Sequence, residues 1–204
     1  MASALRSAVD SPTPGPLLVT ASMLLAIAEG GSDPAATRTV IRGLTAWGRP
    51  EFSAGALAMA TLTGDDGLRR EVRRDAADGG HPLARWLAQL HRSTPAPRAV
   101  ELSTVFRDID ELAIGVTVPG GHALTAVVRV DNEMGVRAIG GAVSGQSLDA
   151  VVQQVVDDGD PDVRVRDIAL ADARVRLADA LRGPDLDLLR GETTPWRQLR
   201  PLVA

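Results

Sequence analysis

Apolar residues follow a helical spacing in the first half of the chain, and in much of the second half they alternate with polar residues. In the first half, capping residues and glycines divide the apolar stripes into short segments, which predicts a small helical bundle. The expected helices cover residues 16–29, 34–47, 53–62 and 65–78, and a last one starts at residue 81. Asp33, Ser53 and Asp65 are the expected N-caps, because their side-chain oxygens can accept hydrogen bonds from free backbone N–H groups.

The alternating pattern of the second half predicts β-strands. The expected strands cover residues 100–106, 112–118, 124–130, 135–143 and 163–168. Pro119-Gly120-Gly121 is the expected turn between the second and third strands, and Ser147 the expected cap of a helix after the fourth. A second helix should cover residues 170–181 and stop at Gly183-Pro184. We therefore predict an antiparallel β-meander module of the α+β class, with helices that cover one face.

The fold class is thus a small N-terminal helical bundle followed by an antiparallel β-meander module covered by helices. The expected segments are a mobile arm at 1–15, the helical bundle at 16–92, a linker at 93–99, the α+β module at 100–183 and a C-terminal segment at 184–204. The C-terminal segment runs apolar to its last residue, so either the chain has been cut there inside a longer parent or its end packs against the body.

Composition narrows the chemistry. The chain has no Cys, Tyr or Lys, so its 22 basic residues are all Arg. The abundance of Arg, Ala, Gly and Pro is typical of a high-GC bacterial genome. Without Cys there is no thiol nucleophile, disulfide or thiolate metal site, and without Lys there is no Schiff base or phosphate-loop lysine. We expect no cofactor.

Location and charge add two expectations. The N-terminus lacks the basic start and apolar run of a signal peptide, and the longest apolar stretch, residues 17–28, is too short to span a bilayer. We therefore expect a soluble, cytoplasmic protein with no membrane partner. Residues 1–98 hold eleven Arg against nine acids, whereas residues 99–204 hold eleven against seventeen, which favours two modules with different surfaces.

The segment Gly140–Ser147 has the spacing of a phosphate-binding loop, but Gln146 stands where that loop needs Lys. The strand before it belongs to an expected antiparallel sheet, which is the wrong context. We interpret it as an ordinary turn followed by a helix cap.

Four arginines, Arg69, Arg70, Arg73 and Arg74, form two adjacent rows on one expected helix and could follow the phosphates of a nucleic acid. Acidic residues lie in the same helix, stacking aromatics are scarce and the net charge is −4. A solvated, salt-bridged helix face is the simpler interpretation, with an acidic protein partner as the other alternative.

A second candidate surface follows from strand direction. If the meander is right, three separate loops bring carboxylates to one end of the sheet, an acidic rim that carries Asp108, Asp110, Glu111, Asp131, Glu133, Asp158 and Asp160. This rim is either a solvated surface, a docking site for a basic partner or a divalent-cation site, since hard cations prefer clustered oxygens. We assign no metal ligand, because the spacing after Asp158 does not match a calcium loop.

The three histidines, His81, His91 and His122, are isolated from one another along the chain, and we interpret them as surface or capping residues with no catalytic role. Our leading hypothesis is a non-enzymatic interaction or regulatory protein, a component of a larger assembly, whose partner is a protein, either a second copy or another chain. The alternatives are a metal-dependent hydrolase that uses the acidic rim and a weak nucleic-acid binder that uses the Arg-rich helix. Whether the protein is an enzyme stays open, with the depleted residue types weighing against it.

Overall fold

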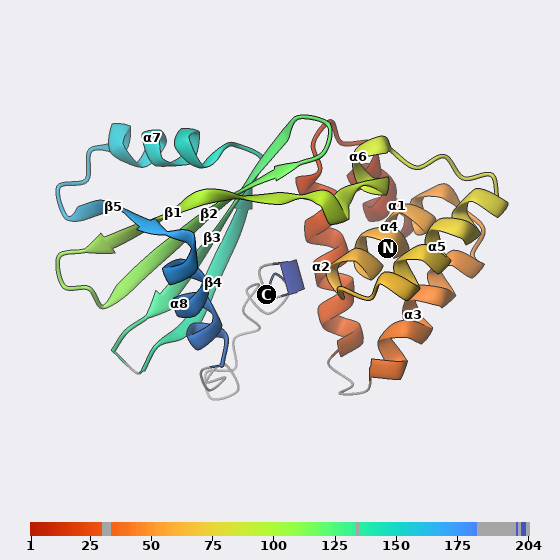
Figure 1. Cartoon of the computed structure of the whole chain (residues 1–204), viewed down its shortest axis with the longest axis horizontal. Helices are drawn as coiled ribbons and strands as arrows, with labels where there is room; N and C mark the ends of the chain where they lie inside the picture. Colours follow the sequence, from red (N-terminus) through yellow and green to blue (C-terminus); the bar gives the residue numbers. More distant parts are fainter. Residues whose placement is uncertain (30–33, 134, 183–198, 200, 203–204) are drawn as a thin grey trace. The chain divides into compact units, whose positions relative to one another are not determined.

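The structure, a computed structural model, describes residues 1–29, 34–133, 135–182, 199 and 201–202. The chain divides into two compact units. The first comprises Met1–Ser93 and Val118–His122 with the described C-terminal residues, and the second comprises Thr94–Thr117 and residues 123–182. Helices make up the first unit and an antiparallel sheet with two helices makes up the second, which confirms the predicted fold class (Figure 1).

The first unit is built around one central helix. Its elements are α1 (Ala2–Val9), α2 (Gly15–Glu29), α3 (Pro34–Ala46), α4 (Pro50–Leu62), α5 (Asp66–Asp78), α6 (Arg85–Ala88) and the short 3₁₀ helix η1 (Leu90–Arg92). All residues from Glu51 to Ala60 in α4 are buried, because α1, α2, α3 and α5 all pack on it. Its many Ala residues leave room for this close approach, while Phe52, Leu57 and Met59 fill the space between helices.

The prediction of a mobile arm at 1–15 is wrong for residues 2–9, which form α1. Leu5 and Ala8 lie one turn apart and are both buried, and the Arg6 guanidinium pairs with the Glu51 carboxylate at 2.9 Å. A Cβ atom added at Gly55 of α4 would lie 2.9 Å from Leu5 Cδ2, so the absence of a side chain there lets α1 approach. The sequence did not predict this helix, because its apolar stripe is short and lies in a segment rich in Ser and Ala.

Two helix ends also differ from prediction. Ser53 is not an N-cap, because α4 starts three residues earlier with Pro50 after an extended Arg49. The Ser53 hydroxyl instead hydrogen-bonds His81 Nδ1 at 2.8 Å. The long helix expected from His81 is reduced to α6 and η1. Asp65 is the N-cap of α5, as predicted, and accepts hydrogen bonds from two backbone N–H groups.

The second unit is a five-stranded antiparallel sheet. Its strands are β1 (Thr94–Thr104), β2 (Ile109–Val118), β3 (His122–Asp131), β4 (Arg137–Ser144) and β5 (Val163–Ala169), in the order β4-β3-β2-β1-β5. All five predicted strands are present. The segment predicted as a linker at 93–99 belongs to β1 from Thr94 onward, where Thr94 pairs with Thr117 of β2. One boundary between the two units nevertheless falls between Ser93 and Thr94. The prolines of this segment are tolerated at the end of the strand, where the register shifts between Pro95 and Ala99.

The two helices of this unit, α7 (Leu148–Asp158) and α8 (Leu170–Arg182), lie on opposite faces of the sheet rather than on one (Figure 1). Leu148 of α7 packs with Val100 and Leu102 of β1. Between these two residues, Glu101 points to the other face, because side chains alternate along a strand, and there it contacts Arg176 of α8. Ser147 caps α7 as predicted. The C-terminal segment and its stop signal at Gly183-Pro184 lie mostly outside the described residues.

Candidate functional site

The structure brings the three loops of the expected acidic rim to one end of the sheet. The backbone N–H of Asn132, after β3, donates to the carbonyl of Asp108, before β2, at 2.8 Å. The first residue of β5, Val163, pairs with Thr104 at the end of β1. The three segments therefore meet, as the meander requires.

The carboxylates at this end are nevertheless mostly engaged with partners. Glu111 pairs with Arg129 at 3.2 Å, and Asp131 pairs with Arg137 at 2.7 Å. Asp108 accepts a hydrogen bond from the Thr104 hydroxyl, which lowers the pKa of the Asp108 carboxyl more than the nearby Asp131 raises it. Repulsion among bare carboxylates is therefore not the main feature of this end of the sheet.

Glu133, Asp158 and Asp160 are exposed, and Asp160 accepts a hydrogen bond from the Asp162 backbone N–H at 2.9 Å. Within the described residues, no group of three or more His, Asp or Glu side chains is arranged to hold a metal ion. The geometry thus gives the divalent-cation interpretation no support.

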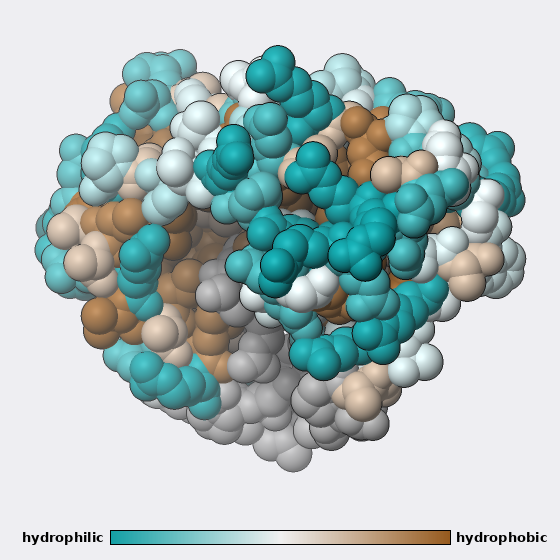
Figure 2. Space-filling model, turned by 45° about the vertical axis from the view of Figure 1, so that its right-hand side comes forward, coloured by the Kyte–Doolittle hydropathy of each residue, from teal (hydrophilic) through white to brown (hydrophobic). Residues whose placement is uncertain are grey.

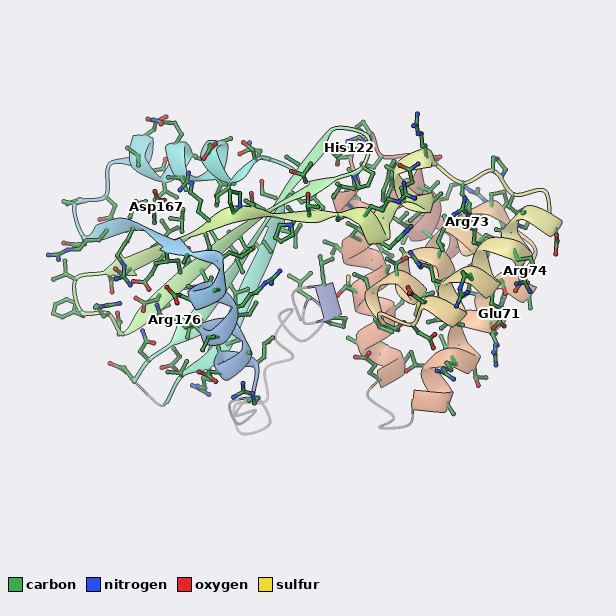
Figure 3. The ribbon with its side chains drawn as sticks, viewed as in Figure 1. Glu71, Arg73, Arg74, His122, Asp167 and Arg176 are labelled. Atoms are coloured by element: carbon green, nitrogen blue, oxygen red, sulfur yellow. The ribbon has the colours of Figure 1, made fainter. Side chains whose placement is uncertain are left out.

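Asp110, expected at the rim, is instead buried in an ionic cluster under α8. Its side chain and that of Glu101 are 1% and 3% exposed. Arg176 of α8, labelled in Figure 3, contacts both carboxylates. Arg166 of β5 and Arg107 each donate to Glu101 Oε1 at 3.0 Å. Buried carboxylates require such partners, since an unpaired buried charge is costly.

The cluster also holds the loop between β1 and β2 in place. Arg107 has φ 54°, a left-handed conformation that is uncommon outside glycine. The Asn132 side chain donates to the Arg107 carbonyl at 2.9 Å and to Asp110 Oδ2 at 2.8 Å. These contacts fix the direction in which the Arg107 side chain leaves the loop.

Next to this cluster lies a pocket of about 340 Å³ whose charged lining is mainly basic. Arg107, Arg164 and Arg166 line it, against the single carboxylate of Glu101. Arg164 makes no ion pair with any residue that the structure describes. The nearly buried Ser103 also contributes to the wall. We call this the arginine pocket; its chemistry suits an anionic group, because several guanidinium donors face one space.

Exposed apolar side chains accompany the arginine pocket. Val105 and Val165 line it and are partly exposed, and Phe106, between two lining residues in the chain, is 90% exposed. On the face of the molecule that Figure 2 shows, hydrophobic residues, in brown, lie exposed among hydrophilic ones, in teal. A large exposed aromatic in a chain with so few aromatics is typical of a contact surface.

The Arg-rich helix is α5, but its four arginines do not form one continuous surface. Arg73 and Arg74 are exposed beside Glu71, as Figure 3 shows, and Glu71 pairs with Arg42. Arg69 instead turns inward and pairs with Asp66 at 2.9 Å. Arg70 donates from Nε to the Asp66 carbonyl. This arrangement fits the salt-bridged face better than a track for phosphates.

His81, His122 and the glycine-rich loop hold structural positions. His81 bonds Ser53, and His122 lies edge-on to Trp86 with 6.3 Å between ring centroids. Gly140 and Gly141 belong to β4, which pairs antiparallel with β3, so a phosphate loop is not formed there. Among the described residues, no carboxylate hydrogen-bonds His81 to complete a catalytic triad with Ser53.

Sequence reasoning missed Glu101 and Arg176, the centre of the cluster. A polar residue between two apolar ones, as in Val100-Glu101-Leu102, normally indicates the solvent side of a strand. The only signal was Arg176 next to Leu177 in the predicted helix, whose apolar stripe also includes Ala173 and Ala180. Their pairing depends on the β1–β5 neighbourhood, which spacing along the chain does not reveal.

Comparison of the chain with protein-family models, with curated proteins and with solved structures gives no match in any of the three. In the described part of the chain, no helix combines the length and apolar character needed to cross a membrane.

Proposed function

We propose that this is a non-enzymatic interaction protein whose second unit binds an acidic segment of a partner protein in the arginine pocket. The observation that supports this most strongly is the set of guanidinium groups of Arg107, Arg164 and Arg166 around one space of about 340 Å³. The sequence suggested a basic partner that docks on the acidic rim. We propose instead an acidic partner that docks in the arginine pocket.

Several N–H donors of the arginine pocket are not engaged by Glu101. Each guanidinium carries five N–H groups, and Glu101 accepts from only one nitrogen of Arg107 and one of Arg166. Arg164 has no ion-pair partner among the described residues. A carboxylate that enters the pocket can therefore form bidentate, charge-assisted hydrogen bonds without displacing Glu101.

The surroundings favour a protein segment over a nucleic acid or a reaction substrate. Phe106, Val105 and Val165 offer apolar contacts to a side chain next to the acidic one. Base stacking would need aromatics that this chain largely lacks. No histidine lines the arginine pocket, and the sequence has no Cys, Lys or Tyr for proton transfer or nucleophilic attack. A cytoplasmic bacterial setting, with a second chain or a copy of this one as partner, completes the proposal.

The test is a fluorescence-anisotropy titration with a labelled peptide that carries Glu residues beside a Leu. Arg164→Ala should weaken binding about tenfold, which is ~1.4 kcal/mol. Arg174→Ala, which removes an exposed arginine of α8 outside the pocket, should leave the affinity within about twofold. A peptide with Gln in place of Glu should not bind, and added salt should weaken the acidic peptide.

Equal effects of Arg164→Ala and Arg174→Ala would show that binding is diffuse attraction to basic residues, and would contradict the proposal. Binding of a single-stranded oligonucleotide that outcompetes the peptide would favour the nucleic-acid alternative instead.

A further inference from the structure

Strand β5 lies at one edge of the sheet, and among the described strands only β1 pairs with it. Every second residue of an edge strand directs its backbone N–H and C=O groups away from the sheet, where a further strand can pair with them. Residues 164–167, in the middle of β5, are all exposed. This edge therefore offers backbone donors and acceptors to a partner.

The arginine pocket reaches the backbone of this edge strand. Three consecutive residues of β5, Arg164, Val165 and Arg166, line it. Neighbouring side chains of a strand point to opposite faces of the sheet, so a space that touches all three residues reaches the strand backbone or passes around its outer side. An occupant of the pocket therefore lies beside the backbone of β5 as well as beside its side chains.

The two faces of β5 differ in chemistry. Arg164 and Arg166 point to one face, and Val165 and Asp167 point to the other, where Asp167 pairs with Arg98. Along an extended strand, Arg164 and Arg166 are about 6.6 Å apart, which is also the spacing of residues i and i+2 in an extended peptide. A peptide strand with two acidic residues at i and i+2 and an apolar residue between them is therefore complementary to this edge.

The same arginines disfavour a second copy of β5 as the added strand. Directly opposite residues of an antiparallel pair lie on the same face of the sheet, so two paired copies of β5 would bring Arg164 and Arg166 close to the same arginines of the other copy. Like charges across neighbouring strands are destabilising. The charge of this edge thus favours an acidic segment over the edge of another copy.

We propose that the acidic segment held by the arginine pocket adds to the sheet as an extra strand beside β5. Its backbone pairs with the outer side of β5, two acidic side chains at i and i+2 meet Arg164 and Arg166, and the apolar side chain between them lies near Val165. This inference rests on the proposed function, because it specifies the conformation and the sequence pattern of the same acidic partner.

The experiment compares two labelled seven-residue peptides of identical composition, matched to the seven residues of β5, by fluorescence anisotropy. Both carry two Glu residues among Val and Thr, at i and i+2 in one peptide and at i and i+3 in the other. Only the first peptide can present both acids to one face of the sheet, so it should bind about tenfold more tightly, the effect of one lost contact between Glu and Arg.

Backbone pairing is tested by N-methylation of the i, i+2 peptide at either its odd or its even positions. The N–H groups of a strand point alternately to its two sides, so one set should abolish binding while the other retains the affinity within about threefold. In the wild-type protein, hydrogen exchange at alternate amides of β5 should slow as the unmethylated peptide saturates it, and the amides of the other edge strand, β4, should not respond.

Two outcomes separate this inference from the proposed function. If both peptides bind equally and Arg164→Ala weakens both, the pocket takes a single carboxylate without strand pairing, which overturns the inference and leaves the proposed function intact. Equal effects of the two N-methylated peptides, or no change in the exchange of β5 amides, also overturn it. If neither peptide binds, the inference and the proposed function fail together.

Discussion

In the helical unit the ion pairs lie mostly at the surface, whereas in the sheet unit two carboxylates lie buried beneath a helix. Arg38 with Asp65 and Arg42 with Glu71 join partly or fully exposed side chains across the outside of the bundle. Glu101 and Asp110 instead lie between the sheet and α8, almost wholly removed from solvent. In the first unit the buried centre is the largely apolar helix α4. In the second unit, the carboxylates of Glu101 and Asp110 occupy buried positions beneath α8 where apolar side chains would normally pack.

This difference teaches what each kind of charge contributes. An exposed pair adds at most about 1 kcal/mol, so the helical unit does not depend on either of these two exposed pairs. The buried Glu51, paired with Arg6 and Arg49, is the exception in that unit. A buried carboxylate depends on all its partners, since removal of one leaves a charge without compensation. In the sheet unit the same carboxylates hold Arg107 and Arg166 in position beside the arginine pocket, so stability and the proposed binding are linked.

The largest expected effect is that of Arg176→Met, which removes the guanidinium shared by Glu101 and Asp110 while retaining similar bulk. We expect a loss of about 3–5 kcal/mol in the free energy of unfolding, measured by urea denaturation. Arg42→Met, the matched change in the helical unit, should lower the free energy of unfolding far less, because solvent screens its exposed pair with Glu71. Equal losses in the two variants would remove the contrast between the units.

The next largest effect is expected from adding a methyl group at a closely packed glycine, which we compare between the two units. An added Cβ at Gly115 of β2 would lie 2.9 Å from Leu148 Cβ, a rigid atom near the backbone, whereas at Gly55 of α4 it meets only the flexible end of Leu5. Gly115→Ala should therefore lower stability by about 1–3 kcal/mol. Gly55→Ala should cost less, since the gain in helix propensity of about 1 kcal/mol offsets the displacement of Leu5. A larger loss for Gly55→Ala would mean that α1 cannot adjust.

Within the sheet unit, Asp131 and Glu133 allow a comparison between a carboxylate in an ion pair and an exposed one. Asp131 pairs with the largely buried Arg137, so Asp131→Asn should lower stability by about 1–2 kcal/mol. Glu133→Gln, two residues along and exposed, should change stability by no more than about 0.5 kcal/mol. If both changes instead stabilise the protein, carboxylate repulsion dominates this end of the sheet after all. Urea denaturation at neutral pH distinguishes the outcomes.

The smallest effect concerns Glu51 at the start of α4. Hydrogen bonding from the backbone and then from Arg6 lowers the pKa of this carboxyl below its usual value. A lowered folded-state pKa contributes stability above the unfolded value of about 4.3, and this contribution is lost as pH falls through the folded value. Glu51→Gln should therefore flatten the fall in stability on acidification, measured by denaturation at pH 7 down to pH 3. An unchanged pH slope would show that Glu51 titrates alike in both states.

Local patterns predicted most of the fold. Alternation gave the positions of all five strands, and side-chain caps at Asp65 and Ser147 marked the starts of α5 and α7. The failures were segments whose structure depends on distant partners. Residues 2–9 fold as α1 because Leu5 meets Gly55, and residues 94–97 extend β1 because β2 lies beside them.

The candidate site was harder to predict for the same reason. Strand direction correctly placed three acidic segments at one end of the sheet, but not the arginines that engage them. Arg176 reaches Glu101 across 75 positions of sequence, because β5 joins the sheet beside β1 and α8 follows it. This pairing depends on the order of the strands in the sheet, and the periodicity of the sequence does not predict that order.

The central claim, that the arginine pocket receives an acidic group, is tested most directly by NMR of the arginine Nε–H signals during titration with the Glu-containing peptide. The account predicts saturable shifts for Arg164 and Arg166 with one dissociation constant, and no change for the exposed Arg73 and Arg74 on α5. Shifts confined to α5, or spread evenly over all exposed arginines, would contradict it.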